Sequence, residues 1–127
     1  MDFVSIRVIT SDVTRLVGFY EKVTEVQAAW ATEDFAELRT AHATLAIGSP
    51  RTFPLFPAGQ AGSVIIEFLV TDVDAVYERL QGVVEDFVKE PTTMPWGNRS
   101  LLFRDPDGNM VNFFTPVTPA AIEKFRR

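Results

Sequence analysis

The sequence has no cysteine, a single histidine and no long apolar run. Without cysteine the protein can form no disulfide, no thiolate nucleophile and no thiolate metal site. No stretch approaches the about 18 consecutive apolar residues that a membrane-spanning helix needs. The N-terminal residues also lack the basic and apolar regions of a secretory signal peptide. We therefore expect a cytoplasmic protein with no membrane partner.

Positive charge is scarce as well. The chain has 12 lysines and arginines against 17 aspartates and glutamates, which gives a formal net charge of −5. The one dense basic cluster is Lys124, Arg126 and Arg127. Because nucleic-acid binding requires a basic surface facing the phosphates, we predict no nucleic-acid partner. The acidic balance is compatible with a cationic small ligand.

Familiar catalytic motifs are missing too. The sequence has no Gly-x-Ser-x-Gly turn, no glycine-rich phosphate loop and no His-Glu-x-x-His. The single histidine, His42, falls at an expected turn between two strands, and we interpret it as a solvated turn residue. Catalytic residues, if the protein has any, are therefore unknown from the sequence.

Two copies of one pattern make up most of the chain. The first copy has a strand, then a helix whose N-cap is Asp12 and whose apolar residues recur at the helical spacing, then three short strands. The apolar helical residues are Val13, Leu16, Val17 and Tyr20, and the predicted strands are Phe3–Ile9, Val26–Trp30, Phe35–Arg39 and Ala43–Ile47.

The pattern recurs sixty residues later, with Asp72 as the N-cap. The matching helical residues are Val73, Val76, Tyr77 and Leu80, and the predicted strands are Val64–Val70, Val83–Val88, Ser100–Phe103 and Met110–Phe114. A turn must join the last two strands, because Pro106 presets its own φ and Gly108 tolerates a positive φ. The two copies end alike, at Ser49-Pro50 and Thr115-Pro116.

This repeat predicts an α+β fold. We expect two βαβββ units whose mixed sheets curve around a cleft, with the helices on the convex side. The 127 residues then form one domain, with 46% hydrophobic residues to build its core. We predict that unit one spans 1–50, an apolar linker 51–63, unit two 64–116 and a C-terminal tail 117–127. The tail is expected to form a short helix carrying Ile122 and Phe125.

Three stretches resemble the vicinal oxygen chelate superfamily, which includes glyoxalases, bleomycin-resistance proteins and extradiol dioxygenases. They are Asp12 leading into Gly18-Phe19-Tyr20-Glu21, Asp72 after its strand, and Pro95-Trp96-Gly97-Asn98-Arg99 running on to Asp105-Pro106-Asp107-Gly108-Asn109. The resemblance covers nearly the whole chain. It implies the paired βαβββ fold, whereas the activity depends on the site.

The resemblance also implies where a metal would bind. Metal-dependent members supply His, Gln or Glu from the first and the last strand of each unit. Here those positions carry Ser5, Ala46, Ile65 and Asn112. Because a divalent metal needs several His, Asp, Glu or Cys donors, we predict no bound metal and no other cofactor.

The same positions predict a binding site for a small organic ligand that is aromatic or cationic. Strand periodicity turns Arg7 and Glu67 to the same side as the four family positions, and we expect these two residues to form an ion pair. Trp96, on a loop between Pro95 and Gly97, is a candidate wall of the site, and Phe114 is a further candidate contact.

Three functions fit the sequence. The one that we favour is a non-catalytic protein that sequesters a small molecule, in the manner of bleomycin-resistance and other antibiotic-resistance proteins, acting as a homodimer. The alternative is a glyoxalase-like or dioxygenase-like enzyme whose metal site is atypical or absent. A third is an interaction module that keeps the fold only for dimerisation.

Overall fold

The computed structural model of the protein describes residues 1–55 and 62–126, which form two compact units. One division between them falls inside the predicted linker 51–63, and Pro106–Gly108 are grouped with the first unit. Part of that linker, including Phe56, lies outside the described residues, and so does Arg127 at the end of the tail.

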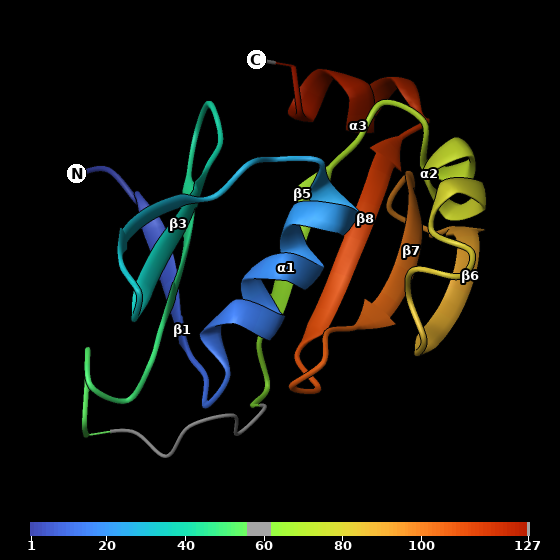
Figure 1. Ribbon diagram of the computed structural model, residues 1–127. Coiled ribbons are helices and arrows are strands. Elements are labelled where there is room, and N and C mark those ends of the chain that lie inside the picture. Colours follow the sequence, from blue (N-terminus) through green and yellow to red (C-terminus); the bar gives the residue numbers. More distant parts are fainter. Residues whose placement is uncertain (56–61, 127) are drawn as a thin grey trace. The chain divides into compact units, whose positions relative to one another are not determined.

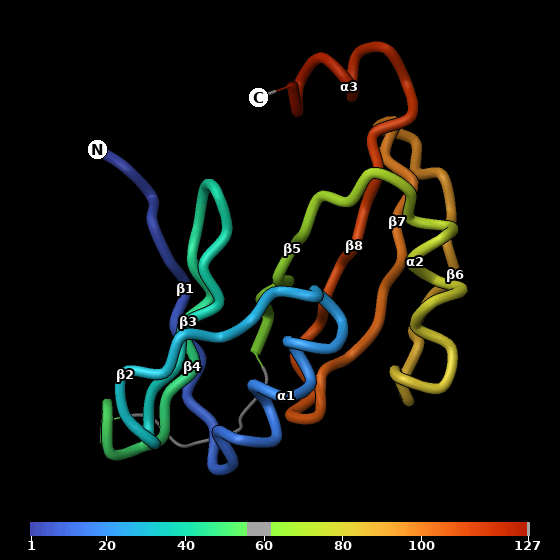
Figure 2. Tube along the Cα trace, turned by 45° about the horizontal axis from the view of Figure 1, so that its top comes forward, coloured from blue at the N-terminus to red at the C-terminus, as the bar shows by residue number. Residues whose placement is uncertain are grey.

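The first unit has the predicted βαβββ order. Its elements are β1 (Ser5–Ile9), α1 (Val13–Thr24), β2 (Ala29–Thr32), β3 (Phe35–Arg39) and β4 (Thr44–Gly48). The four strands form one mixed sheet in the order β1-β4-β3-β2, here called sheet A (Figure 2). β1 and β4 are parallel, and the other neighbouring strands are antiparallel.

The second unit repeats this arrangement. Its elements are β5 (Ile65–Leu69), α2 (Val73–Arg79), β6 (Phe87–Thr93), β7 (Asn98–Arg104), β8 (Met110–Pro116) and α3 (Pro119–Lys124). The strands form sheet B in the order β5-β8-β7-β6, with β5 and β8 parallel (Figure 1). The matching strand orders confirm the predicted α+β fold of two βαβββ units. A cleft shared by both sheets remains a prediction.

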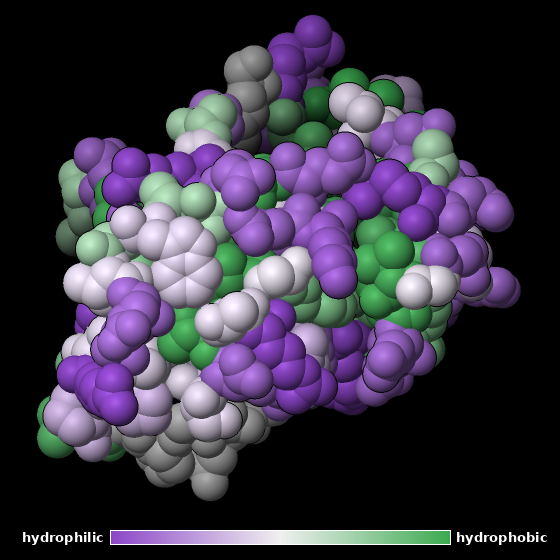
Figure 3. Space-filling model, in the orientation of Figure 1, coloured by the Kyte–Doolittle hydropathy of each residue, from purple (hydrophilic) through white to green (hydrophobic). Residues whose placement is uncertain are grey.

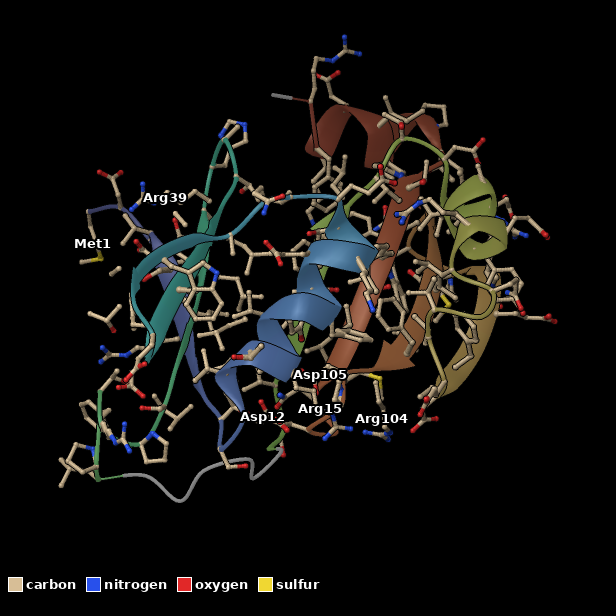
Figure 4. All side chains as sticks on the ribbon, in the orientation of Figure 1. Met1, Asp12, Arg15, Arg39, Arg104 and Asp105 are labelled. Atoms are coloured by element: carbon tan, nitrogen blue, oxygen red, sulfur yellow. The ribbon has the colours of Figure 1, made fainter. Side chains whose placement is uncertain are left out.

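Helix α1 begins where the sequence places its N-cap. The side chain of Asp12 accepts a hydrogen bond from the backbone N–H of Arg15, with 3.1 Å between the two atoms (Figure 4). This bond satisfies one of the N–H groups that the first turn leaves without a helical partner. The apolar stripe is buried, and α1 packs on the face of sheet A formed by β3 and β4. The buried residues of the stripe are Val13, Leu16, Val17, Tyr20 and Val23.

Helix α2 is capped in the same way by Asp72, which accepts from the backbone N–H of Ala75 over 3.1 Å. It packs against β6, β7 and β8. Val73 and Leu80 are fully buried, as predicted, but Val76 and Tyr77 are only half-buried. The prediction of full burial was wrong for these two because α2 has only 7 residues and leaves part of its apolar stripe uncovered.

Aromatic rings fill the space between α2 and sheet B. Tyr77 meets Phe87 edge-on with 5.1 Å between ring centroids, and Phe87 meets Phe103 at 6.3 Å. Phe113 then contacts Phe103 at 5.2 Å and Phe68 at 5.3 Å. Edge-to-face contacts suit the charge distribution of aromatic rings and add to the stabilisation from apolar burial. This chain of rings identifies the face of sheet B that α2 covers.

The strand predicted at Val26–Trp30 is displaced towards the C-terminus. Glu25 ends α1 in the left-handed conformation, with φ of 60°. The carboxylate of Glu21 then accepts the backbone N–H of Ala28 over 2.8 Å. Because this N–H is taken by a side chain, the sheet ladder starts only at Ala29.

The strand predicted at Val83–Val88 is wrong for a similar reason. After α2 the chain continues in a turn in which the N–H groups of Val83 and Val84 both bond to the carbonyl of Leu80. Gly82 supports this turn with φ of +79°. The apolar valines therefore belong to the helix C-terminus, where Val84 is buried. β6 begins at Phe87 and, as an edge strand, accommodates a proline before it ends at Thr93.

Two other predictions are confirmed. The turn between β7 and β8 follows Arg104 and Asp105 at the end of β7 (Figure 4), and Gly108 has φ of +89°. Asp105 holds the turn through the backbone N–H and side chain of Asn109, at 2.9 and 2.8 Å. The tail forms the short helix α3 at Pro119–Lys124.

Hydrophilic side chains dominate the face of the molecule seen in Figure 3, and apolar ones show there in several separate areas. Within residues 1–55 and 62–126, none of the helices has the length and apolar character that crossing a membrane would require.

Candidate ligand-binding face

The predicted site residues of the first unit lie on the face of sheet A that α1 leaves open. In the parallel ladder, Ser5 is the partner of Thr44 and Arg7 is the partner of Ala46. The alternate residues of these strands, such as Leu45, point to the face under α1. Ser5, Arg7 and Ala46 therefore share one face, as the two-residue period predicts.

The open face of sheet B carries the other predicted residues. Across the ladder Ile65 pairs with Met110, Glu67 with Asn112, and Leu69 with Phe114. All six alternate with residues of the aromatic chain, such as Phe113, so they lie on the side opposite α2. Leu102 of β7 is the partner of Asn112 on the same face.

The most specific contact on this face joins Glu67 to Asn112. The Nδ2 of Asn112 donates to Oε2 of Glu67 over 2.8 Å. Glu67 is exposed, whereas only 8% of Asn112 is accessible to solvent. The Oδ1 of Asn112 has no hydrogen-bond partner in the described part of the chain. Buried polar atoms are normally paired, so an amide oxygen in this state is a point at which a ligand donor would be accommodated.

Arg7, at the position of sheet A that matches Glu67, has a different neighbour. Its guanidinium lies over the ring of Phe53, with 5.2 Å between Cζ and the ring centroid. Such a cation–π contact is an electrostatic attraction between the guanidinium and the face of the ring. Arg7 and Glu67 are both exposed and belong to different units, and the ion pair between them remains a prediction.

Two aromatic residues of the open faces were not among the predicted site residues. Phe53 comes from the linker, and Phe125 follows α3 and meets Phe114 edge-on at 5.0 Å. Each belongs to the segment that follows the last strand of its unit. The apolar character of the linker and tail was a signal for packing, but sequence spacing does not say which face of the sheet receives them.

Trp96 lies in the turn between β6 and β7 and is 64% exposed. The turn is closed by a bond from the N–H of Gly97 to the carbonyl of Met94. Gly97 in turn accepts bonds from the N–H groups of Val117 and Thr118, which lead into α3. Trp96 therefore stands next to α3 with its indole in solvent, and its contact with a ligand remains a prediction.

The family positions do not fit a divalent metal. In sheet A they carry Ser5 and Ala46, and in sheet B they carry Ile65 and Asn112. Neither pair includes the imidazole, thiolate or carboxylate ligands that such ions require. Across residues 1–55 and 62–126, no three His, Asp or Glu side chains come together as a metal site would need.

Charged residues elsewhere have structural roles. Arg99, on the face of sheet B that α2 covers, binds the carboxylate of Asp74 through Nε and Nη2, with distances of 2.9 to 3.2 Å. This hydrogen bonding raises the pKa of Arg99, and burial opposes the shift. Arg39 pairs with Glu37 two residues earlier on β3. His42 is exposed between β3 and β4, as predicted.

The fold agrees with the comparisons to known proteins. The sequence model of the Glyoxalase/Bleomycin resistance protein/Dioxygenase superfamily matches residues 2–113, so the chain belongs to that superfamily. No curated protein sequence matches the chain.

Several solved structures share the fold. A member of the same superfamily from Sphaerobacter thermophilus is 26% identical, with a TM-score of 0.70 over 91% of this chain and 98% of that one. A protein described only as a conserved domain protein is 28% identical, with a TM-score of 0.79 over 91% and 99%. A lactoylglutathione lyase from Agrobacterium tumefaciens, at 20% identity, has a TM-score of 0.69 over 89% and 92%. This last likeness is one of fold alone.

Proposed function

We propose that the protein binds a small organic ligand on the open face of sheet B and does not transform it. The observation that carries this proposal is the pair of Asn112 and Glu67, because a buried amide oxygen without a partner among the described residues lies beside an exposed carboxylate. Such a pair can orient a polar group of a ligand without a metal.

The surroundings of the pair support the proposal. Ile65 and Leu69 flank Glu67 on β5 and are 52% and 48% exposed. Phe114 lies next to Leu69 on the neighbouring strand. Apolar contacts around a few polar groups are typical of sites for small organic molecules. Superfamily membership is compatible with binding and with catalysis, so the support for binding comes from these residues.

The test is calorimetric titration with a panel of planar aromatic compounds that are cationic, neutral or anionic. We expect at least one compound to bind with a dissociation constant in the micromolar range, about −8 kcal/mol. Trp96→Ala should weaken that binding about tenfold if the indole contacts the ligand. Trp30→Ala is the matched control, since it removes the indole of the other unit.

Catalysis is tested in the same samples. Each bound compound is incubated with the protein, with and without added divalent metals, and analysed by mass spectrometry. Recovery of the compound unchanged supports the proposal. A product formed in proportion to protein concentration would contradict it and would favour a glyoxalase-like or dioxygenase-like enzyme.

The proposal includes a homodimer, because a ligand face of this kind can be completed by a second chain. Light scattering coupled to size-exclusion chromatography measures the mass directly, against 14.2 kDa for one chain. A dimer that strengthens on ligand addition supports a shared site, whereas a monomer that binds ligand with full affinity contradicts it.

A further inference from the structure

The hydrogen bond between Asn112 and Glu67 leaves an excess of acceptors on the open face of sheet B. An ionised carboxylate has about four lone-pair positions, and Glu67 uses one of them for Asn112 Nδ2. Asn112 Oδ1 has two further lone-pair positions, and neither accepts a hydrogen bond from the described residues. The orientation of the amide is determined, because turning it would bring its oxygen against the carboxylate. A ligand at this part of the face would therefore be bound through its hydrogen-bond donors.

Within the described residues of its own unit, the negative charge of Glu67 is not balanced by a neighbouring cation. No ion pair to Glu67 is found within the described residues of the second unit, 62–105 and 109–126. Two basic residues of the strands lie on the open face of sheet B, and each has another neighbour or is distant from Glu67. Arg104 lies 3.8 Å from the carboxylate of Asp86. Lys89 is on β6, three strands from Glu67, which at about 4.8 Å per strand separates them by about 14 Å. Lys124, beyond β8, lies over the ring of Phe125.

The apolar residues beside the pair limit the kind of cation that fits. Ile65 and Leu69 stand on either side of Glu67 along β5, each about half exposed. Phe114 and Leu102 adjoin Asn112 on the same face. Apolar side chains offer a hydrated metal ion no ligand atoms. A hard cation such as Ca²⁺ needs six to eight oxygen ligands. A cation attached to a hydrocarbon body uses both the polar pair and its apolar surroundings.

We infer that the ligand of this face is an organic cation with N–H donors, an amidinium or a primary ammonium on an aromatic or aliphatic body. The charged nitrogen lies between Glu67 Oε1 and Asn112 Oδ1, and the body lies against the exposed side chains of Ile65 and Leu69. The negative charge of Glu67 favours a positively charged ligand. Asn112 Oδ1 favours a ligand with a hydrogen-bond donor, whether the ligand is charged or neutral. This inference rests on the proposed function and specifies the chemical class of its ligand.

Three probes of one shape test the inference: benzamidinium, benzamide and benzoate. The first is a cation with N–H donors, the second is neutral with N–H donors, and the third is an anion with acceptors only. Each is titrated into ¹⁵N-labelled protein, and dissociation constants are taken from amide shifts in β5 and β8. We expect benzamidinium to bind at least about tenfold more tightly than benzamide, and benzoate to leave these shifts unchanged.

Two variants separate the roles of the pair. Glu67→Gln keeps the side-chain shape and removes the charge, so it should weaken benzamidinium about tenfold and leave benzamide nearly unchanged. Asn112→Leu should weaken both, because both donate N–H groups. Glu78→Gln, an exposed carboxylate on α2, is the matched control and should change neither. Dispersed amide spectra establish that each variant is folded.

The outcomes distinguish this inference from the proposed function. Benzoate binding as tightly as benzamidinium, or equal binding of benzamidinium by wild type and Glu67→Gln, overturns the cationic ligand even where other panel compounds bind. The comparison of benzamidinium with benzamide and with benzoate needs only the wild-type protein, so a poorly folded variant does not remove the test. If no compound of either set binds, the proposed function itself is wrong.

Discussion

Asn112 and Glu67 are direct partners across the parallel strands β8 and β5, and their side chains are joined by a hydrogen bond of 2.8 Å. The bond satisfies the Nδ2 of Asn112 but leaves its Oδ1 buried without a partner in the described chain. A position that serves stability alone would favour an apolar residue there. The arrangement therefore resembles a binding position maintained at some cost in stability.

This cost gives the first prediction. Asn112→Leu removes a buried amide oxygen that lacks a partner, so we expect the free energy of unfolding to be unchanged or raised by up to about 1 kcal/mol. Glu67→Ala leaves the Nδ2 of Asn112 unpaired and should lower the free energy by about 1–2 kcal/mol. Urea denaturation followed by circular dichroism measures both. A loss of more than about 2 kcal/mol in Asn112→Leu would contradict the argument.

The second prediction concerns glycines. A Cβ at Gly97, where φ is +97°, would lie 2.1 Å from Oγ1 of Thr118 and 3.1 Å from Cβ of Ala121. Gly97→Ala should therefore lower the free energy of unfolding by about 2–4 kcal/mol, because it adds a steric clash to the backbone strain.

Substitutions at two other glycines separate the effect of the steric clash from that of the backbone strain. Gly82 has φ of +79° with nothing near its absent Cβ, so Gly82→Ala should cost only the strain, about 1 kcal/mol. Gly18 lies inside α1 with open space around it, and Gly18→Ala should stabilise by about 0.5–1 kcal/mol. Equal effects of Gly97→Ala and Gly82→Ala would show that the contact with Thr118 is absent.

The third prediction tests the aromatic chain under α2. Phe113 is 1% exposed and touches the rings of both Phe68 and Phe103. Phe113→Ala should lower the free energy of unfolding by about 3–5 kcal/mol, because it leaves a cavity in the core. Phe125→Ala, at a half-buried ring on the other face, should lower it by about 1 kcal/mol. Thermal and urea denaturation should both show a larger loss of stability in Phe113→Ala than in Phe125→Ala. A larger loss in Phe125→Ala would contradict a core on the face of sheet B that α2 covers.

The fourth prediction uses the repeat. Asp12 and Asp72 cap equivalent helices with the same bond length of 3.1 Å. Replacing either by alanine should lower the free energy of unfolding by about 1 kcal/mol, because one N–H group of the first turn loses its partner. Asparagine at either position keeps an acceptor oxygen and should cost much less. Equal losses for Ala and Asn would mean that charge, rather than the cap, stabilises the helices.

The sequence was sufficient for the parts of the fold that local chemistry determines. Asp12 and Asp72, each followed by an apolar stripe at helical spacing, marked the start of both helices. Pro106 and Gly108 marked the last turn. These features depend on residues within one or two turns of chain, where backbone preference and capping decide the outcome. Alternation along the strands also predicted correctly that, within its own sheet, Arg7 shares a face with Ser5 and Ala46, and Glu67 with Ile65 and Asn112.

Local chemistry that was harder to recognise explains the two displaced strands. The valines after α2 have strand propensity, but Leu80 binds their N–H groups in the turn that closes the helix. The carboxylate of Glu21 likewise takes the N–H of Ala28 before β2 begins. In both places a backbone N–H group bonds to an acceptor at a helix end and not to a neighbouring strand. Strand propensity alone does not predict which of these two acceptors the N–H group takes.

Only the tertiary structure decided the candidate site. Asn112 and Glu67 are 45 residues apart, and the register of two parallel strands brings them together. The same packing leaves Asn112 Oδ1 without a partner and brings Phe125 onto Phe114. The sequence by itself determined the repeat, the helix starts and the loss of metal-binding residue types at the family positions. Which polar atoms are satisfied depends on contacts between distant segments, because burial and hydrogen bonding are set by the packed sheet.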